Sequence, residues 1–306
     1  MHHGAAGVTI GGMPGQTLGE IRSLLAGAGL APRHRYGQNF LIDLNLMRKV
    51  VDAAEVRPDD VILEVGPGTG SLTELLLERG AQVVAVEIDR GLQTLIAQRL
   101  GGERRFALVA GDVLAGKSEI NPAVVDALRA RPPGAGGTYK LVANLPYQIA
   151  TPLLMDLLLG PLRFERLVCT IQKEVGERLL APAGSDAYGP VSVLTETLAE
   201  ARLAAHLPPE AFWPRPKVES VLIALRSRER SSVDVEDVAG FAAFVQRAFQ
   251  QRRKTMRRIL REMSDERTNA EDVLRLAEIS SDCRPEQLSP PVWRQLHRAW
   301  RACWGS

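Results

Sequence analysis

The chain has 306 residues, of which 45% are hydrophobic and 24% charged, the profile of a soluble globular protein. This length suits one large α/β domain with a smaller second domain. No stretch approaches the ~20 apolar residues that cross a bilayer, and the first residues lack the basic flank and apolar core of a signal peptide. We therefore expect a protein that is neither inserted in a membrane nor exported.

The cysteines and the charge narrow the expectation further. Cys169, Cys283 and Cys303 are spaced neither as a disulfide framework nor as metal ligands, which favours a reducing cytoplasm and predicts no bound metal. The formal net charge of +2 is weak evidence for a nucleic-acid partner. Between Gln246 and Arg261, however, seven basic residues occur without an acidic one, namely Arg247, Arg252, Arg253, Lys254, Arg257, Arg258 and Arg261. Such a cluster neutralises phosphates better than the net charge suggests.

The N-terminal third begins with small residues and then becomes helical. Residues 1–17 are rich in glycine and other small residues and are expected to be loosely attached. Apolar spacing predicts helices at Leu18–Leu30 and Leu44–Ala54. The segment between them, residues 33–41, mixes basic and aromatic side chains.

From Asp60 onward, short apolar runs alternate with helical patterns. The predicted strands are Val61–Val65, Gln82–Val86, Phe106–Ala110, Tyr139–Ala143 and Arg166–Ile171, and the predicted helices are Leu72–Glu78, Gly91–Leu100 and Pro152–Leu159. Pro132–Gly137 is predicted to be a loop. The alternation implies an α/β fold with a Rossmann-like parallel sheet and right-handed crossovers. Two later runs, Ala199–Leu203 and Ser220–Leu225, are predicted to close one edge as an antiparallel pair.

The character of the chain changes after Arg226. Ser227–Asp237 is polar and predicts a linker. The helices predicted beyond it are Phe241–Met263, Ala270–Ile279 and Pro291–Trp304. We therefore expect an extension and helix over residues 1–35, a cofactor-binding domain over 36–226 and a small all-helical domain over 227–306.

A glycine-rich turn, residues 64–70, joins the first predicted strand to its helix. Gly66 and Gly68 allow a tight turn and close approach of a ligand to the main chain. Alone, such a turn also fits a plain structural turn or a nicotinamide dinucleotide site. Glu87 ends the second strand, where it could accept both hydroxyls of a ribose, and Asp112 follows the third, where it could accept from an adenine amine. Acids at successive strand ends together favour S-adenosyl-L-methionine.

The fourth predicted strand ends in Asn144-Leu145-Pro146-Tyr147. Asn144 and a main-chain carbonyl near Pro146 could accept the hydrogens of an amine as it attacks a methyl group. Tyr147 offers a face on which a base can stack, worth ~1–3 kcal/mol, and Pro146 keeps the turn rigid. The pattern predicts methylation of an exocyclic amine, in DNA, in RNA or on a protein glutamine.

Taken together, these motifs resemble the ribosomal RNA adenine dimethyltransferase family, which includes the bacterial kasugamycin-sensitivity enzyme. The matching segments run in family order over most of the chain. They are Tyr36–Asp43, Glu64–Gly70, Val86–Asp89, Gly111-Asp112, Asn144–Tyr147, Gln172–Val175, Tyr188-Gly189, Phe212–Ser220 and Gln251–Thr255. Trp213 and Arg215 are larger than the residues expected from the family pattern.

The resemblance implies a class I methyltransferase sheet and assigns roles to several residues. Asn39 and Leu41 would cover S-adenosyl-L-methionine from the N-terminal side, and Phe212 would face Tyr147 across a flipped adenine. The rest of the cofactor pocket would be formed by Gly66, Gly68, Glu87, Asp112 and Asn144. The residues implied to grip RNA phosphates at the start of the helical domain are Arg252, Arg253, Lys254 and Arg257.

Three functions remain open at this point. The long C-terminal segment favours the small-subunit branch, which implies a monomer that dimethylates two adjacent adenines in a hairpin near the 3′ end of 16S rRNA in immature 30S particles. The macrolide-resistance branch would act on large-subunit rRNA instead. A non-catalytic RNA-binding assembly or transcription factor on the same fold is the third possibility, against which the intact strand-end motifs argue.

Overall fold

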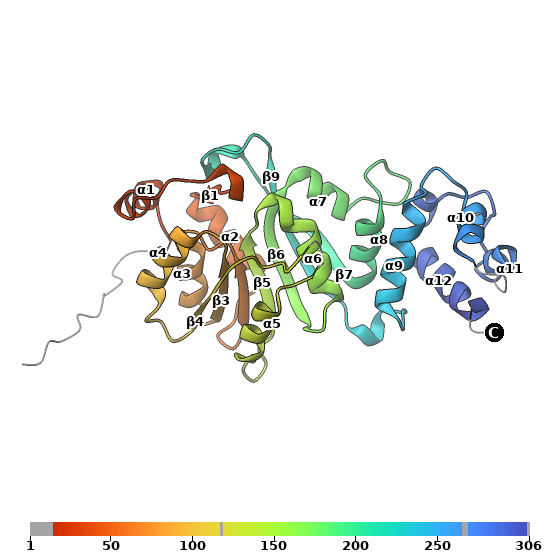
Figure 1. Cartoon of the computed structure of the whole chain (residues 1–306), viewed down its shortest axis with the longest axis horizontal. Coiled ribbons are helices and arrows are strands. Elements are labelled where there is room, and N and C mark those ends of the chain that lie inside the picture. The colour runs from red at the N-terminus through yellow and green to blue at the C-terminus, as the bar shows by residue number, and fades with distance from the viewer. Residues whose placement is uncertain (1–14, 117–118, 265–268, 305–306) are drawn as a thin grey trace, which may run out of the picture.

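A central sheet forms one end of an elongated molecule and a group of helices forms the other (Figure 1). The computed structural model describes residues 15–116, 119–264 and 269–304. Most of the segment predicted to be loosely attached, residues 1–14, therefore lies outside the described residues. The order across the sheet is β4 (Phe106–Ala110), β3 (Gln82–Glu87), β2 (Val61–Val65), β5 (Tyr139–Asn144), β6 (Phe164–Gln172), β9 (Ser220–Ser227) and β7 (Ala199–Leu207).

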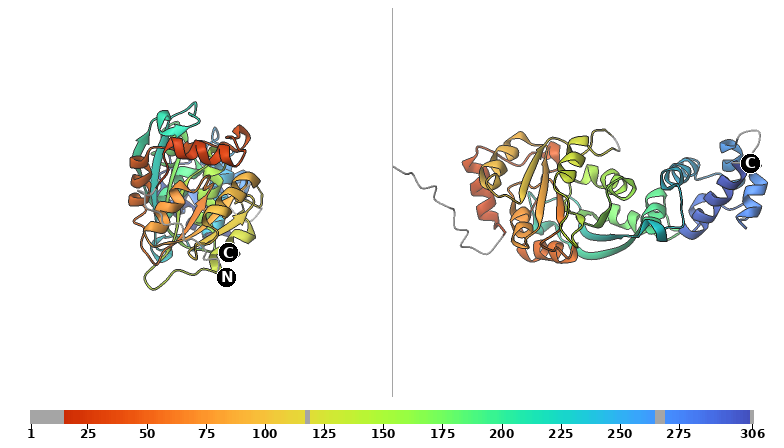
Figure 2. Two further views of the ribbon diagram at one scale, coloured as in Figure 1. Left: turned by 90° about the vertical axis from the view of Figure 1, so that its left-hand side faces the viewer. Right: turned by 90° about the horizontal axis from the view of Figure 1, so that it is seen from below.

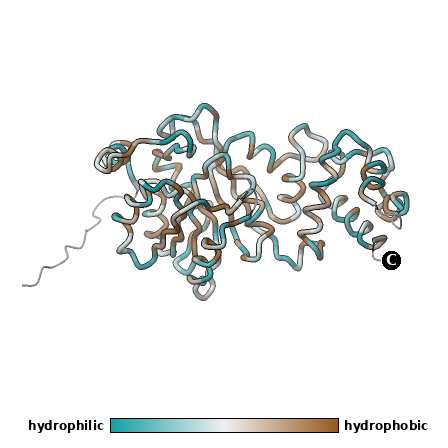
Figure 3. Tube along the Cα trace, viewed as in Figure 1, coloured by the Kyte–Doolittle hydropathy of each residue, from teal (hydrophilic) through white to brown (hydrophobic). Residues whose placement is uncertain are grey.

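The strand directions confirm the α/β class and the predicted antiparallel edge. Strands β4 to β6 run parallel to one another, while β9 is antiparallel to both β6 and β7. All five residues of β2 are buried, as expected for a parallel strand covered on both faces. Figure 3 shows the hydrophobic residues concentrated along the strands and the hydrophilic ones along the outer loops.

Helices cover both faces of the sheet. One face packs against α2 (Leu44–Ala53), α3 (Ser71–Glu78) and part of α4 (Arg90–Leu100). The other packs against α5 (Pro122–Arg129), α6 (Ala150–Leu159), α7 (Lys173–Leu179) and α8 (Pro190–Leu198). Helices α5, α7 and α8 are absent from the sequence prediction. For α5 a signal exists, because Asn121 caps the helix through its side chain and Pro122 occupies the first turn.

The C-terminal helices are α9 (Val238–Phe249), α10 (Met256–Met263), α11 (Ala270–Leu276) and α12 (Pro290–Trp304). The prediction of one helix over Phe241–Met263 is wrong, because the chain leaves the helix after Phe249. Thr255 adopts an extended conformation before α10, and the main-chain N–H of Met256 donates to the Cys283 carbonyl at 2.7 Å. A tertiary contact thus starts a new helix although the apolar spacing continues across the break.

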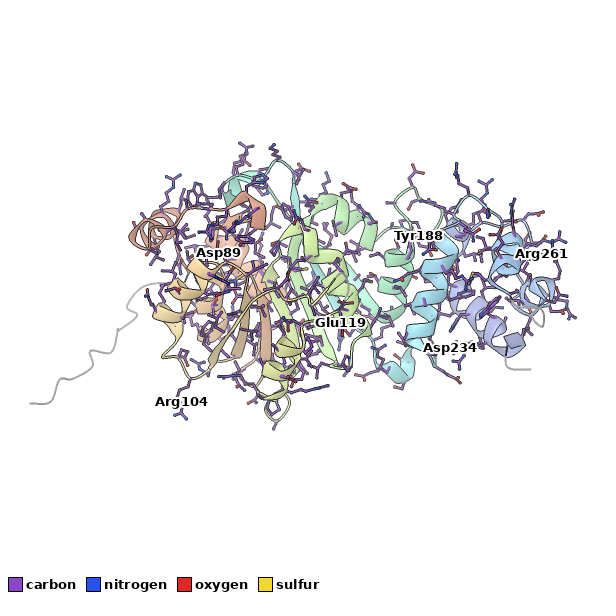
Figure 4. The ribbon with its side chains drawn as sticks, in the orientation of Figure 1. Asp89, Arg104, Glu119, Tyr188, Asp234 and Arg261 are labelled. Carbon is purple, nitrogen blue, oxygen red and sulfur yellow. The ribbon has the colours of Figure 1, made fainter. Side chains whose placement is uncertain are left out.

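The junction between the sheet and the C-terminal helices is packed. Helix α8 contacts both α9 and α12, and one hydrophobic cluster runs from the sheet through these helices. Tyr188, labelled in Figure 4 beside α8 and α9, is buried and donates from its hydroxyl to the Leu288 carbonyl at 2.7 Å. Helices α10 and α11 lie beyond this junction, at the C-terminal end of the elongated molecule (Figure 2). None of the described helices is long and apolar enough to span a bilayer.

Candidate active site

A pocket opens at the carboxyl ends of the parallel strands, where the strand order reverses at β2 and β5. This is where open α/β sheets bind ligands. The empty space in the pocket, its open mouth included, is about 1000 Å³. Its lining contains eight of the predicted site residues, namely Asn39, Gly66, Gly68, Glu87, Asp112, Asn144, Pro146 and Tyr147.

The glycine-rich turn after β2 forms the floor of this pocket. Gly66 and Gly68 have φ angles of +72° and +60°, which favour glycine because a Cβ is crowded there. A Cβ on Gly68 would also lie 2.8 Å from the ring of Phe40. Glycine at this position therefore allows the turn and Phe40 to pack together, so that both line the pocket.

Glu87 ends β3, and the residue is 3% exposed. One oxygen accepts from the Asp89 N–H at 2.8 Å and the other from the Gly68 N–H at 3.4 Å. Burial raises the pKa of Glu87 to about 7, against the lowering effect of these main-chain donors. Each oxygen keeps a lone pair with which it can accept a ribose hydroxyl.

Asp112 lies beyond β4 at the open side of the pocket. Gly111 before it has a φ of +138°, and one Asp112 oxygen accepts from the Leu114 N–H at 3.0 Å. This turn fixes the carboxylate at the strand end and leaves its second oxygen for a ligand amine.

The side chain of Asn144 is held at both ends of its amide. Its Nδ2 donates to the Asn39 carbonyl at 2.7 Å, and its Oδ1 accepts from the hydroxyl of Thr170. Because the amide oxygen has two lone pairs, one remains for a donor inside the pocket.

The ring of Tyr147 is fixed through its hydroxyl group. That hydroxyl lies 2.8 Å from the hydroxyl of Ser220, the first residue of β9. Burial raises the pKa of the Tyr147 phenol, so the ring stays neutral at physiological pH. Pro146 precedes it at the start of a single 3-10 turn, and the resulting platform can accept a planar base.

The arrangement fits S-adenosylmethionine. A buried carboxylate at the end of β3 suits the ribose, an exposed one after β4 suits the adenine amine, and the turn at Gly66 and Gly68 allows close approach to the main chain. Among the described residues, no group of three or more His, Cys, Asp or Glu side chains could hold a metal ion.

Sequence similarity decides the family. Residues 29–288 match the model of the family described as "Ribosomal RNA adenine dimethylase". The ribosomal RNA small subunit methyltransferase A of Moorella thermoacetica is 41% identical over 285 residues, which are 93% of this chain and 96% of that protein. The chain belongs to the ribosomal RNA adenine dimethylase family. It is an adenine dimethyltransferase of rRNA, and S-adenosylmethionine is its cofactor.

Further members and solved structures agree with this placement. The enzyme of the same name from Streptomyces coelicolor is 40% identical over 275 residues, 88% of this chain and 91% of that protein. A dimethyladenosine transferase from Plasmodium falciparum has a TM-score of 0.71 at 22% identity, covering 86% of this chain and 98% of that one. The 23S rRNA methyltransferase ErmE has a TM-score of 0.62 at 24% identity, covering 85% and 99%. At these identities the two structures demonstrate a shared fold.

Two residues implied by the family resemblance do not line the pocket of this dimethylase. Leu41 and Phe212 are 6% and 3% exposed and belong to the hydrophobic core. They pair with each other across a two-stranded sheet, β1 (Phe40–Leu41) with β8 (Phe212–Trp213). Leu41 thus supports the pocket wall from behind. For Phe212, stacking on a target adenine stays a prediction that requires its ring to leave the core.

The basic run of the dimethylase lies mainly on the turn between α9 and α10 and on α10. Its charges are largely paired with acids from outside the run: Lys254 and Arg258 with Glu262, Arg257 and Arg261 with Glu271, and Arg252 with Glu286. Within the described part of the chain, Arg247 and Arg253 form no ion pair, and both are exposed. The basic run therefore has less unpaired positive charge than its sequence alone indicates.

The sequence prediction misses several residues around the pocket. Gln16 is buried and contacts the glycine-rich turn. Its side-chain Oε1 accepts from the Thr69 hydroxyl at 2.6 Å, and its main-chain N–H donates to the Ser71 hydroxyl at 2.8 Å. Arg33 pairs with Asp89 at 3.0 Å, next to Glu87. Thr170 and Ser220 hold Asn144 and Tyr147, as described above. Of these residues, only Arg33 has a signal in the local sequence, because it belongs to the basic segment 33–35.

Proposed function

We propose that this dimethylase transfers methyl groups from S-adenosylmethionine to the N6 amines of two adjacent adenines in a hairpin near the 3′ end of small-subunit (16S) rRNA. One observation carries the proposal: Asn144 and Tyr147 stand in the same pocket as Glu87 and Asp112. The acids suit the nucleoside part of the methyl donor. The asparagine and tyrosine suit a planar base that carries an amine.

The chemical difficulty lies in the acceptor, because the lone pair of the adenine amine is delocalised into the ring. S-adenosylmethionine supplies a methyl group on a positively charged sulfur. The carbon–sulfur bond breaks as the nitrogen–carbon bond forms, S-adenosylhomocysteine leaves as a neutral thioether, and the methylated nitrogen then releases one proton to water. The remaining lone pair of Asn144 Oδ1 accepts one amine hydrogen, and a main-chain carbonyl near Pro146 accepts the other. Both hydrogen bonds favour a tetrahedral nitrogen and strengthen as positive charge develops on it, which stabilises the transition state more than the ground state.

Tyr147 holds the base while this happens. The hydroxyl of Tyr147 lies 2.8 Å from the Ser220 hydroxyl, which holds the ring in place. Stacking of a base therefore costs little further conformational entropy of this side chain. Base stacking on an aromatic ring contributes ~1–3 kcal/mol, which offsets part of the cost of taking an adenine out of its stack.

The small-subunit target is supported by the relatives that share about two fifths of their residues with this chain, since those from Moorella and Streptomyces both carry the name of a small-subunit methyltransferase. The large-subunit enzyme ErmE is more distant, at 24% identity. We infer that the substrate particle is an immature 30S subunit in the cytoplasm and that the dimethylase acts as a monomer.

We further propose three functional parts: an N-terminal extension and helix (residues 1–35), a methyltransferase domain (36–226) and a helical RNA-binding domain (227–306). In the last, Arg252, Arg253, Lys254 and Arg257 would contact RNA phosphates. Arg253 is the strongest candidate among them because it is exposed and unpaired within the described residues. The pocket would then bind the target adenine, and the turn between α9 and α10 would bind the phosphates of a second RNA segment.

Methylation of separated ribosomal particles tests the proposal. Immature 30S and 50S particles, incubated with the protein and labelled S-adenosylmethionine, should acquire label in the 30S rRNA alone, recovered as N6,N6-dimethyladenine by mass spectrometry. Label found only in 50S particles would assign the protein to the large-subunit branch. Failure to bind the cofactor in calorimetry would support the non-catalytic factor instead.

A further inference from the structure

Thr170 occupies a fully buried position beside the candidate catalytic asparagine. It lies on β6, and its exposed fraction is 0%. In the parallel register of β5 and β6 it is the partner of Asn144, so the two side chains project from the same face of the sheet. The Thr170 hydroxyl donates to Oδ1 of Asn144.

Two contacts together determine how the Asn144 amide is oriented. Its nitrogen can only donate and its oxygen can only accept. The Asn39 carbonyl accepts from Nδ2 at 2.7 Å, so reversing the amide would set two acceptors against each other. The Asn39 carbonyl therefore selects the orientation, and the Thr170 hydroxyl fixes the position of the oxygen.

We propose that Thr170 is a positioning residue for methyl transfer, whose hydroxyl holds the amide oxygen of Asn144 so that its second lone pair faces the target amine. The inference rests on the proposed function, because it assigns Asn144 as the acceptor for the amine. Thr170 itself contacts neither the base nor the reacting methyl group in this scheme. It acts only through the oxygen that it holds.

Packing alone does not account for a hydroxyl at this position. The neighbouring residues Val168, Cys169 and Ile171 are apolar and fully buried, and valine has nearly the same shape as threonine. A buried hydroxyl without a partner is unfavourable. The partner of this one is the pocket asparagine, which favours a role in the site over a role in the core.

The test compares substitutions that keep or remove the hydroxyl. Thr170→Val removes it at constant shape, and Thr170→Ser keeps it. Thr195→Val is the matched control, since Thr195 is also buried but its hydroxyl has no hydrogen-bond partner among the described residues. Each variant is measured for kcat and KM on immature 30S particles, for the Kd of S-adenosylmethionine by calorimetry, and for its Tm.

Because misplacing reacting groups by ~1 Å can cost ~100-fold in rate, we expect kcat of Thr170→Val to fall by about tenfold or more. KM and the cofactor Kd should stay within about twofold of wild type, and Thr170→Ser should recover most of kcat. Thr195→Val should match wild type. In an Asn144→Ala background, Thr170→Val should cause no further loss, because the two residues act as one unit.

Wild-type kcat in Thr170→Val would overturn the inference, as would an equal further loss in the Asn144→Ala background. A fall in kcat that Thr170→Ser does not recover would also overturn it, since the hydroxyl would then not be the cause. These results differ from failure of the proposed function, in which the wild-type protein itself would methylate no 30S rRNA.

Discussion

The main-chain carbonyl of Asn39 accepts a 2.7 Å hydrogen bond from Nδ2 of Asn144, 105 positions further along the chain. Asn39 lies in the segment that closes one side of the pocket, and Asn144 ends β5, where we propose that it accepts from the target amine. The cofactor side and the substrate side of the site are therefore connected by one direct contact. Changing Asn144 should affect both sides.

Asn144→Ala removes the amine acceptor and the donor to Asn39 together. We expect kcat to fall about 100-fold or more, as for loss of one transition-state hydrogen bond in other enzymes, and the cofactor Kd to weaken. The Tm should change little because the side chain is only partly buried at the pocket wall. Asn45→Ala, an exposed position on α2, serves as the control. Full methylation by Asn144→Ala would refute the assigned role.

Cofactor binding should depend on pH through Glu87. Burial raises the pKa of this carboxyl to about 7, so half of the free protein carries it protonated near neutral pH. Protonation turns one oxygen into a donor and makes the carboxyl group a weaker acceptor for two ribose hydroxyls. Binding should therefore weaken as pH falls through 7. Well below this value we expect the Kd to rise about tenfold per pH unit.

Calorimetry between pH 5.5 and 8 measures this dependence. Glu87→Gln should bind more weakly at neutral pH and show no step near pH 7, which also corrects for any titration of the ligand itself. The step should persist in Glu64→Gln, which changes the other buried carboxyl near the turn. A step of the same size in Glu87→Gln would locate the titrating group elsewhere.

Local sequence patterns predict the fold and site where the structure depends on short stretches of chain. The parallel strands β2 to β6 are apolar runs, and the inner strands β2, β3 and β5 are largely buried because helices cover both faces of the sheet. The polar residues that follow them meet in one pocket, because parallel strands end at the same edge. Gly66, Glu87, Asp112 and Asn144 are therefore predictable by position, and the pocket contains all four.

Contacts between distant segments are not predictable in this way. The break between α9 and α10 depends on Met256 and Cys283, and the apolar spacing gives no sign of it. Thr170 looks like one more residue of a buried strand until its partner 26 positions away is known. Phe212 is assigned to the pocket by family resemblance, yet its ring lies in the core.

A buried ion pair at the amino-terminal ends of the central strands β2 and β5 provides a stability prediction. Lys140 Nζ lies 2.7 Å from Asp60, with the two side chains 1% and 0% exposed. Lys140→Met would leave the buried Asp60 carboxylate with only the half-exposed Arg57, 3.6 Å away, as a cationic partner. Removing one partner of a buried pair costs about 3–5 kcal/mol. Chemical denaturation should show this loss of unfolding free energy. Arg178→Met, which breaks the exposed pair with Glu174, should cost no more than about 0.5 kcal/mol.

The neighbouring arginines of the α9–α10 turn should behave differently from each other. Arg252 donates to the main-chain carbonyls of Asp186 and Ser185 at 3.2 and 3.4 Å and lies 3.8 Å from Glu286. It thereby joins the turn to the loop before α8. Arg253 is exposed, and within the described residues it has no ion-pair partner. We expect Arg252→Gln to lower the Tm as well as RNA binding, and Arg253→Gln to weaken RNA binding at unchanged Tm.

Salt dependence separates a phosphate contact from a structural one, because each phosphate neutralised contributes a roughly constant slope to the plot of log K against log salt concentration. Arg253→Gln should therefore reduce that slope by about 1. Arg275→Gln, an 82% exposed side chain on α11 outside the basic run, should leave both slope and Tm unchanged. An unchanged slope in Arg253→Gln would remove this side chain from the RNA interface. RNA binding by the basic run would then depend on Arg252, Lys254 or Arg257. Single substitutions of these residues by Gln would show which of them contributes to the slope.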